Sequence, residues 1–500
     1  MLLEMVADTI GDRIAIGSHS DGTTYAELLA TARRGAARLR AHGTERVAYL
    51  GLNAPQLPAL LFAAGAAGAA FAPLNYRYTD AQLSAAVAAL APAAAVLGPG
   101  AAGRINGGNG VDRLDADALF AGPDAGPDAG PDGEPAFVAP DAVAVLLLTS
   151  GTSGPPKVAV LRHEHLVPYV ISTVEFAAAG PDEAILVSVP PYHVAGISSV
   201  LTSVYAGRRM VQLPAFAADA WVELAATERV THAMVVPTML GRILDELERR
   251  GERLPALRHL SYGGGRMPLP VVERALRLLP GVDLVNAYGL TETSSTIALL
   301  GPDDHRAALA SDDPAVRARL GSVGRPLPSV ELQIRDDDGV PVPAGVSGEV
   351  WVRGEQVSGE YVSHRATTAD GWYPTRDRGH LDAGGYLFLD GRADDVIVRG
   401  GENISPGEIE DVLLEHPAVA DAAVLGVPDT EWGERIEAVI VPAGAPPAEP
   451  ELQEWVRARL RSTRVPARVH VRNALPATET GKVLRRLLRE ELGAAREAIG

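Results

Sequence analysis

The sequence contains no cysteine, and this absence excludes several kinds of chemistry. A chain of 500 residues without cysteine forms no disulfide, holds no metal through thiolates and attacks no substrate with a cysteine nucleophile. Disulfides are characteristic of secreted proteins, so their absence fits a reducing compartment, and we expect a cytoplasmic protein. The length exceeds that of one ordinary hydrophobic core, and we therefore expect at least two domains.

Excess basic charge is also lacking. The 45 Lys and Arg residues are outnumbered by 63 Asp and Glu residues, which gives a formal net charge of −18. A protein that binds nucleic acid needs a basic face to neutralise phosphates, so we expect no nucleic-acid partner. The first residues carry acids early and lack the basic start of a signal peptide.

Long apolar runs are scarce too. The run LPALLFAAGAAGAAFAPL at residues 57–74 has about the minimum length of a membrane span. It consists mostly of alanine and glycine and ends beside a proline, which favours a buried helix over a span. We therefore expect no membrane span.

The residues that are present alternate between two periodicities. Helical and strand-like patterns follow one another to about residue 298, which is typical of α/β folds, and residues 24–52 predict a helix and then a strand. After residue 321 polar and apolar residues alternate, and Asp338-Gly339 and Asp390-Gly391 predict the turns of two hairpins. We predict an α/β fold whose large N-terminal domain contains helix-flanked β-sheets and a small β-barrel-like part.

A second, smaller domain is expected near the C-terminus. Ser405, Pro406 and Glu408 predict a helix start, with a serine cap, a proline in the first turn and a glutamate that reaches back. Two strand-like runs, AAVLGV and RIEAVIVP, follow. The apolar residues of the tail fall on one face of a helix: Val483, Leu484, Leu487, Leu488 and Leu492. We therefore divide the chain into an N-terminal domain, residues 1–391, and a small, mobile α+β domain, residues 392–500.

The stretch TSGTSGPPK at residues 149–157 directly follows an apolar, strand-like run. It offers what a polyphosphate needs: unhindered backbone N–H groups at its glycines, several hydroxyls and the ammonium of Lys157. It is not a P-loop, because Val158 stands where a P-loop places its magnesium-binding serine or threonine. By themselves these residues predict either a phosphate site or a flexible surface turn.

Three further motifs follow this loop: NAYGLTETSS at residues 286–295, GWYPTRDRGHLDAGGYLFLDGRADDVIVRGGENISPGEIE at residues 371–410, and LPATETGKVLRR at residues 475–486. Together with the loop they resemble the adenylate-forming superfamily, which includes acyl-CoA synthetases, the adenylation domains of peptide synthetases and luciferase. The resemblance covers nearly the whole chain. It implies that a carboxylate attacks the α-phosphate of ATP to form acyl-AMP and pyrophosphate, and that a thiol then displaces AMP.

The resemblance also implies which residues bind the nucleotide. The β- and γ-phosphates would be held by Thr149, Ser150, Gly151, Thr152, Ser153, Gly154 and Lys157. The adenine site would comprise Gly264, Gly265, Asn286, Ala287, Tyr288 and Gly289, with the ring of Tyr288 stacked on the base. Thr291 would contact phosphate, Asp377 would accept the ribose hydroxyls, and Arg392 would contact ribose and phosphate.

Three residues are implied in catalysis. Glu292 would bind Mg²⁺, with Thr149 as a second ligand, since one carboxylate with phosphate oxygens and water is a typical magnesium site. Lys482 would bridge the carboxylate and the α-phosphate and so stabilise the charge of the transition state. His193 would gate the passage between the acyl pocket and the thiol. Outside the family's motifs, Glu292 and Lys482 are ordinary surface charges and His193 is a structural hydrogen-bonding residue.

For the second step the family turns its C-terminal domain about a hinge, which matches Asp394. The CoA site would then include Gly400, Gly401, Glu402 and Trp432, although Trp432 is equally suited to core packing. The acyl pocket would include His193, Val194, Gly196 and Gly263. Residues 188–200 contain no acid that could bind an α-amino group, so we expect a carboxylic acid with an apolar body: bulky, aryl, polycyclic or fatty.

The sequence departs from the family's pattern at two places that bear on the site. Arg376 precedes Asp377 where glycine is usual, and Arg266 follows Gly264-Gly265 where alanine is common. We expect an acyl-CoA ligase that uses ATP, Mg²⁺, CoA and a small-molecule acid and is a monomer or homodimer. Three alternatives stay open: an acyl-AMP ligase that loads a separate carrier protein, a nucleotide-binding relative without catalysis, and an oxygenase of the luciferase type.

Overall fold

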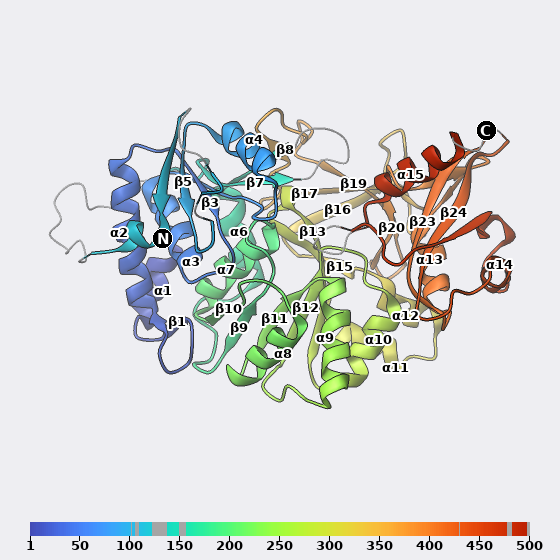
Figure 1. Ribbon diagram of the computed structural model, residues 1–500, viewed down its shortest axis with the longest axis horizontal. Helices are drawn as coiled ribbons and strands as arrows, with labels where there is room; N and C mark the ends of the chain where they lie inside the picture. Colours follow the sequence, from blue (N-terminus) through green and yellow to red (C-terminus); the bar gives the residue numbers. More distant parts are fainter. Residues whose placement is uncertain are drawn as a thin grey trace.

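The computed structural model describes residues 1–101, 103–105, 110–122, 138–149, 157–429, 431–477 and 483–497, without the side chains of 149, 403 and 493–497. The elements from the N-terminus to β20 form the larger part, and the last elements, orange to red, form a smaller unit beside it (Figure 1). The predicted α/β fold with a large N-terminal and a small C-terminal part is confirmed.

The first sheet has seven strands, parallel from β7 to β6, and the antiparallel strands β8 and β18 extend it at one edge. The helix and the strand predicted within residues 24–52 are both present, and Thr24 and Glu27 form a capping box at the start of the helix. Residues 57–74 form a helix and then a strand, because left-handed Gly68 ends the helix. The strand order is β18 (Glu360–Tyr361), β8 (Lys157–Arg162), β7 (Val143–Thr149), β4 (Ala70–Pro73), β3 (Arg46–Leu50), β5 (Ala93–Leu97) and β6 (Val111–Asp115).

The second sheet has nine strands, and its central strands from β13 to β1 run parallel. Antiparallel strands extend it at both edges. Its order is β15 (Arg325–Pro326), β14 (Ser295–Leu300), β13 (Asp283–Leu290), β12 (His259–Gly263), β11 (His232–Val235), β9 (Ala184–Val187), β10 (Arg209–Gln212), β1 (Ile14–Ile16) and β2 (Thr23–Thr24).

Helices separate and cover these two sheets, so that the apolar clusters form between alternating layers. The space between the sheets is filled by α1 (Leu2–Ile10), α2 (Tyr25–Ala41), α3 (Gln56–Ala67), α5 (Ala116–Phe120), α6 (His163–Thr173) and α7 (Val194–Ala206). The outer face of the first sheet packs on α4 (Asp80–Leu90). The outer face of the second packs on α8 (Ala218–Thr227), α9 (Pro237–Arg250) and α10 (Leu269–Leu278). Short segments follow: η1 (Thr291–Thr293), α11 (Pro302–Ala310), α12 (Pro314–Ala318) and η2 (Arg319–Gly321).

A four-stranded antiparallel sheet stands where the sequence predicts a β-barrel-like part. Its order is β16 (Val330–Arg335), β17 (Gly348–Gly354), β19 (Tyr373–Leu381) and β20 (Leu387–Arg392). The predicted turn at Asp338-Gly339 lies between β16 and β17. The predicted turn at Asp390-Gly391 is wrong, because both residues lie inside β20 and form a β-bulge against β19. Gly391 has a φ of +135°, and the bulge lets the strand continue to its last residue instead of reversing.

The C-terminal unit is a mixed sheet with flanking helices. Its strands are β22 (Glu402–Ile404), β21 (Ile397–Arg399), β24 (Gly433–Pro442), β23 (Val419–Asp429) and β25 (Arg468–Val471), and its helical segments are α13 (Pro406–Leu414), α14 (Glu449–Arg457), η3 (Ser462–Arg464) and α15 (Arg485–Glu497). The predicted helix start at Pro406 is confirmed, but the predicted capping is wrong. The hydroxyl of Ser405 donates to the Asp390 carbonyl, and Glu408 pairs with Arg464 at 3.4 Å.

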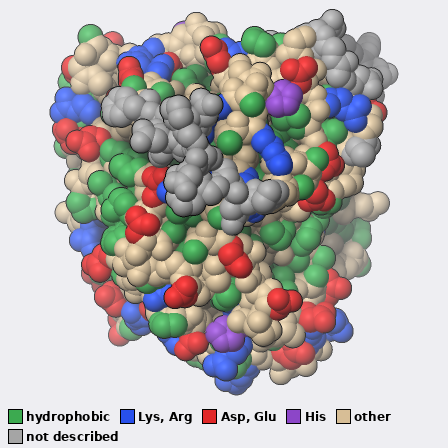
Figure 2. Space-filling view, turned by 90° about the vertical axis from the view of Figure 1, so that its left-hand side faces the viewer, with side chains coloured by type: hydrophobic (Ala, Val, Ile, Leu, Met, Phe, Trp, Pro, Cys, Tyr) green, Lys and Arg blue, Asp and Glu red, His purple; other side chains and the backbone are tan. Residues whose placement is uncertain are grey.

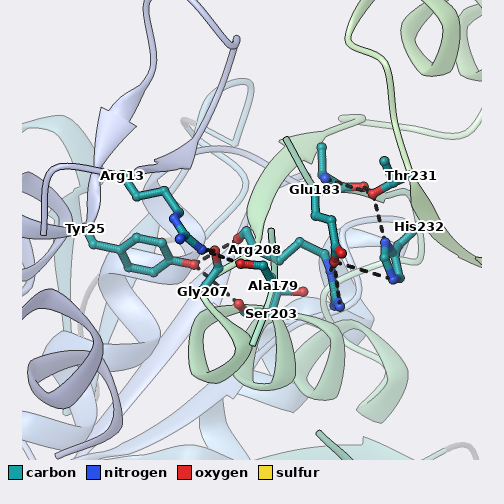
Figure 3. Close-up of polar contacts among 10 residues, drawn as sticks. Arg13, Tyr25, Ala179, Glu183, Ser203, Gly207, Arg208, Thr231 and His232 are labelled. Atoms are coloured by element: carbon teal, nitrogen blue, oxygen red, sulfur yellow. Dashed lines mark hydrogen bonds and ion pairs between the residues drawn. The ribbon is translucent and has the colours of Figure 1, made fainter. Parts of the chain in front are cut away.

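A polar network closes the amino ends of the second sheet (Figure 3). Glu183 lies 3.4 Å from Arg208 and 3.9 Å from His232, and the hydroxyl of Tyr25 donates to the Arg208 carbonyl at 2.9 Å. Burial, helped by the charge of Arg208, lowers the pKa of His232 to about 2, so its ring stays neutral. The network fastens α2 to the sheet and lies at the end opposite the strands' carboxyl edge.

None of the described helices is long and apolar enough to cross a membrane. Figure 2 shows acidic and basic side chains interspersed on one face, and the side chains coloured there form no continuous basic stripe.

One arginine of the N-terminal part reaches the C-terminal unit. Arg266, just beyond β12, forms an ion pair with Asp411 of α13 and lies 4.0 Å from Glu410. The guanidinium rests on Gly407, where an added Cβ would lie 1.4 Å from an arginine nitrogen. Burial raises the pKa of Asp411 to about 6, so the pair loses its negative partner in mildly acidic solution.

Substituting Arg266→Ala is expected to loosen the C-terminal unit. Because the chain has no cysteine, spin labels on Val340→Cys and Val471→Cys report only the distance between the two parts, and both positions are exposed. At pH 7.5 the pulsed-EPR distance distribution should be broader in Arg266→Ala than in the unsubstituted chain. Below pH 6 the two distributions should converge. Identical distributions at pH 7.5 would show that this contact does not hold the unit.

Candidate active site

The predicted nucleotide residues come from segments that meet beyond the carboxyl ends of β12 and β13. This edge is where sheets of this type bind ligands, in the crevice beyond the parallel strands. Gly264 and Gly265 directly follow β12, and η1 with Glu292 directly follows β13. The four-stranded sheet adds Asp377 from β19 and Arg392 from β20.

Asp377 is the centre of the best-defined polar cluster in this region. Its carboxylate accepts a hydrogen bond from the hydroxyl of Tyr288 at 2.6 Å and one from the guanidinium of Arg392 at 3.0 Å. Burial, followed by the charge of Asp377, raises the pKa of Tyr288 well above its usual value, so the phenol stays protonated and donates. The structure therefore brings together three residues that the sequence assigned to adenine and ribose.

The β-bulge described above sets this pairing. Arg392 is the strand partner of Asp377, and the extra residue at the bulge brings the two side chains opposite each other. Arg376, where the family usually has glycine, has a φ of +61°. A side chain in this left-handed region costs roughly 1–2 kcal/mol, which glycine avoids. The corner before Asp377 therefore keeps the shape that glycine would give it, although arginine occupies it.

Several of the predicted adenine residues, and Gly263 of the predicted acyl pocket, are also required by the packing of the sheet. An added Cβ would lie 2.2 Å from the Ala287 carbonyl at Gly263 and 1.8 Å from the Ser295 carbonyl at Gly289. Gly264 has a φ of +77°. The side chain of Asn286 is buried and donates to the Ser322 carbonyl at 3.0 Å. These residues shape the end of the sheet, whether or not they contact the base.

Glu292 is held from two directions. Its backbone carbonyl accepts hydrogen bonds from the amides of Ser358 and Gly359, both at 2.9 Å, and its buried side chain accepts one from the hydroxyl of Tyr361 at 2.5 Å. The next residues are strained, since Ser294 and Ser295 have φ values of +58° and +117°. Strain of this kind persists only where the surrounding structure fixes it, and it is concentrated at functional sites.

The fit of Glu292 to a metal ion can be judged from its neighbours. Within the described ranges no three His, Asp or Glu side chains form a group that could hold a metal by themselves. Tyr361 occupies Oε1 of Glu292, and among the residues that the structure describes none hydrogen-bonds to Oε2. Mg²⁺ commonly binds through one or two carboxylates together with substrate phosphates and water. The residues present therefore fit a magnesium ion that arrives with a nucleotide.

Three of the predicted acyl-pocket residues lie at the start of α7, and the fourth, Gly263, is the last residue of β12. His193 precedes the helix, Val194 is its first residue, and Gly196 in the first turn packs against the Pro190 carbonyl. Burial lowers the pKa of His193 to about 4, so its ring is neutral at pH 7. The ring centroid lies 4.6 Å from that of Tyr192, which makes this end of the region aromatic and uncharged.

The predicted hinge and CoA residues lie together on the C-terminal unit. Asp394 is exposed and directly follows the four-stranded sheet. The amide of Gly400 donates to the Trp432 carbonyl at 2.8 Å, and an added Cβ would lie 3.1 Å from the Trp432 ring. That ring is 47% exposed, which opposes the alternative of core packing. Gly401 has a φ of +81°, and Glu402 forms an ion pair with Arg464.

Several predicted residues lie outside the described part of the chain: Ser150, Gly151, Thr152, Ser153, Gly154, Lys482 and the side chain of Thr149. Their surroundings are described. Lys157 begins β8, and its ammonium lies 5.5 Å from the centroid of the Tyr361 ring. Arg485, just after Lys482, donates to the buried Glu410 at 2.5 Å and to the Val424 carbonyl at 3.2 Å. These contacts anchor the helix that follows Lys482.

Sequence reasoning missed two residues of this region, Tyr361 and Arg485. Tyr361 lies outside every motif used above, and its contact with Glu292 depends on how distant segments pack. Arg485 lies within the last motif and beside the apolar face of a predicted helix, where a buried charge implies a buried partner. The burial of Arg485 could therefore have been predicted from the sequence, but the identity of its partner, Glu410, could not.

Comparison with known proteins identifies the family of the chain. Residues 3–362 match the family described as AMP-binding enzyme, and residues 408–482 match the AMP-binding enzyme C-terminal domain. The chain is 35% identical to a feruloyl-CoA synthase from Amycolatopsis sp, over 94% of each chain. It is 33% identical to an indoleacetate–CoA ligase from Aromatoleum aromaticum, over 92% of this chain and 91% of the relative. It is 32% identical to a fatty acid–[acyl-carrier-protein] ligase from Streptomyces coeruleorubidus, over 93% and 91%.

A solved structure matches over almost its full length. The o-succinylbenzoate coenzyme A synthetase of Bacillus subtilis, in complex with ATP and magnesium ion, superimposes with a TM-score of 0.82 and 28% sequence identity. The match covers 97% of this chain and 98% of that one. This agreement confirms the predicted fold class.

Replacing Arg376 by glycine is expected to stabilise the protein. Glycine adopts the left-handed φ without steric cost, so the free energy of unfolding should rise by about 1 kcal/mol. Urea denaturation followed by tryptophan fluorescence measures this change. The matched control is Arg378→Gly two residues later in β19, where glycine should destabilise by a similar amount. A loss of stability in Arg376→Gly would mean that the arginine side chain makes contacts that outweigh the strain.

Replacing Tyr288 by phenylalanine tests the cluster around Asp377. The ring remains, but the carboxylate loses the hydroxyl that orients it, and the affinity for AMP should fall about tenfold. Calorimetric titration with AMP measures this. Tyr386→Phe is the control, because its hydroxyl donates to a different carboxylate, that of Asp304, at 2.6 Å. Equal affinities in all three proteins would show that the Tyr288 hydroxyl does not contribute to AMP binding.

Proposed function

Because the chain belongs to the AMP-binding enzyme family, we propose that it is an ATP-dependent acyl-CoA ligase whose active site lies between Asp377, Glu292 and the start of α7. The observation that carries this proposal is the contact of Tyr288, Asp377 and Arg392 at the carboxyl edge of the second sheet. A buried carboxylate with two fixed donors is oriented to accept the hydroxyls of a ribose.

The distribution of lysine supports the same site. Lys157 and Lys482 are the two lysines of the sequence, and every other member of its 45 Lys and Arg residues is arginine. The chain therefore carries arginine, not lysine, at every other strongly basic position. A compact ammonium on a flexible stem differs from a planar guanidinium, and both lysines stand in motifs assigned to phosphate chemistry. This pattern favours a specific role for each amine.

The proposed reaction needs no nucleophilic side chain. The substrate carboxylate attacks the α-phosphorus of ATP, the bond to the β-phosphate oxygen breaks, and pyrophosphate leaves with its electron pair. The thiol of CoA then attacks the acyl carbonyl, AMP departs with the oxygen that bridged carbon and phosphorus, and the thiol proton goes to solvent. The protein orients the reactants and stabilises charge, with Lys482 opposite the α-phosphate and Lys157 on the leaving pyrophosphate. Mg²⁺ bound with the nucleotide at Glu292 would supply further charge neutralisation.

The acid is proposed to have an aryl or other apolar body. Residues 188–200 carry no acidic side chain that would bind an α-amino group, and the neutral His193 lies against the ring of Tyr192. Two of the relatives described above are named for aryl acids, ferulate and indoleacetate. CoA is the proposed acceptor. Loading of a separate carrier protein is the second candidate, since one relative is named for that activity.

A panel of carboxylic acids with ATP, Mg²⁺ and CoA tests the substrate class. Phenylpropenoic, indolyl, polycyclic and long aliphatic acids should give acyl-CoA products identified by mass, and acetate should give much less. A strong preference for acetate, or for amino acids, would overturn the assignment. Parallel reactions with a phosphopantetheinylated carrier protein in place of CoA separate the two acceptors. The cytoplasmic location, the boundary after residue 391 and the monomer or homodimer state stay predictions.

Replacing Lys482 separates the two half-reactions. Lys482→Ala should lower pyrophosphate release by roughly 10²–10³-fold, because a fixed cation is removed from the transition state. Thioester formation from added acyl-AMP should stay near the unsubstituted rate, since the proposed second step uses another face of the C-terminal unit. Lys482→Arg keeps the charge and tests whether the compact amine is needed. Equal loss of both half-reactions would contradict a role confined to adenylation.

A further inference from the structure

Tyr361 stands between the two charged groups assigned to the polyphosphate end of ATP. Its hydroxyl donates to Oε1 of Glu292 at 2.5 Å, and the ammonium of Lys157 lies 5.5 Å from the centroid of its ring. One side chain therefore contacts both the carboxylate proposed to bind Mg²⁺ and a lysine of the phosphate loop. None of the functional motifs of the sequence includes this tyrosine.

The backbone around Tyr361 is fixed on both sides. Strand β18 pairs with β8, where Tyr361 lies opposite Ala159, two residues after Lys157. The neighbouring Glu360 holds this strand through Arg162, with contacts of 2.6 and 2.9 Å, and through Arg365 at 2.9 Å. The position of the tyrosine ring is thus determined by the sheet that carries the phosphate loop.

A second hydroxyl supports the first. The phenol oxygen of Tyr373 lies 3.5 Å from that of Tyr361, on the side away from solvent. The Tyr361 hydroxyl thus has two partners, the Glu292 carboxylate and the Tyr373 hydroxyl, and together they fix its orientation. Oε1 of Glu292 is engaged, no described side chain or amide hydrogen-bonds to Oε2, and the backbone carbonyl of Glu292 is held by Ser358 and Gly359.

We propose that Tyr361 is a positioning residue that fixes Glu292 for Mg²⁺ through its hydroxyl and Lys157 for pyrophosphate through its ring. This inference rests on the proposed function, because it needs ATP as the ligand. The physical reason is the same as for the outer partners of metal ligands in general: a carboxylate held in one orientation binds its cation without first losing conformational freedom. The ring face attracts the ammonium electrostatically and limits the directions it takes.

Two substitutions of Tyr361 separate these roles. Tyr361→Phe keeps the ring and removes the hydroxyl, whereas Tyr361→Leu removes both. In the absence of acid, calorimetry of ATP binding at increasing Mg²⁺ gives the half-saturating Mg²⁺ concentration. It should rise about tenfold in both variants, within the range seen when outer partners of metal ligands are removed. Pyrophosphate affinity without Mg²⁺ should fall in Tyr361→Leu and stay unchanged in Tyr361→Phe.

The control variants make each outcome decisive. Tyr386→Phe also removes a phenol that donates to a carboxylate, Asp304, and should change neither quantity. Urea unfolding of every variant shows whether it is folded, and Tyr361→Phe removes a single oxygen. The double variant Glu292→Gln with Tyr361→Phe should need no more Mg²⁺ than Glu292→Gln alone, because the hydroxyl acts through Glu292.

The results distinguish this inference from the proposed function. If Glu292→Gln leaves the Mg²⁺ requirement unchanged, the metal assignment within the proposed function is wrong. If Glu292→Gln raises the requirement and Tyr361→Phe does not, the metal assignment stands and the positioning role of the hydroxyl is overturned. If Tyr361→Leu binds pyrophosphate as well as Tyr361→Phe does, the role of the ring is overturned.

Discussion

The ion pair between Asp377 and Arg392 connects the parts of the molecule on which the proposed activity depends. It joins β19 to β20, and the hydroxyl of Tyr288 links the same carboxylate to β13 of the large second sheet. The side chain of Asp377 is 11% exposed, so its charge is stabilised by these two donors more than by water. The proposed ribose site is thus also the junction of two sheets.

The C-terminal unit begins directly after the strand that contains Arg392 of this ion pair. Arg392 is the last residue of β20, and Asp394 follows within two residues. Motion of the C-terminal unit about this point would leave the ribose contacts in place, because they belong to the N-terminal part. On the moving side, the buried pair of Arg485 and Glu410 connects α15 to α13. The segment with Lys482 would therefore move together with the whole unit.

Much of this arrangement could be predicted from the sequence, and the failures have physical causes. The order of helices and strands follows from periodicity, and the motifs place Asp377, Arg392 and Tyr288 together. Asp390-Gly391 is a bulge and not a turn, because the choice depends on pairing with β19, which no local pattern records. Ser405 precedes a helix as predicted, but its hydroxyl donates to the Asp390 carbonyl on β20 and accepts no hydrogen bond from the first turn of the helix.

The contacts that sequence reasoning missed are those between distant segments. Tyr361 meets Glu292 only because β18 adds to the edge of the first sheet beside β8. Arg266 departs from the family's pattern, and its ion pair with Asp411 appears only when the two parts of the molecule are placed together. Arg376 could be identified as unusual from the sequence, but its positive φ is visible only in the structure.

In the proposed first step the carboxylate of the substrate attacks the α-phosphorus of ATP. Incubating an accepted acid labelled with ¹⁸O in both carboxyl oxygens, together with ATP, Mg²⁺ and CoA, tests it directly by the mass of the AMP formed. The account predicts one ¹⁸O atom in each AMP, since the bridging oxygen stays on phosphorus when the thiol attacks. Unlabelled AMP with ¹⁸O in pyrophosphate or phosphate would contradict it.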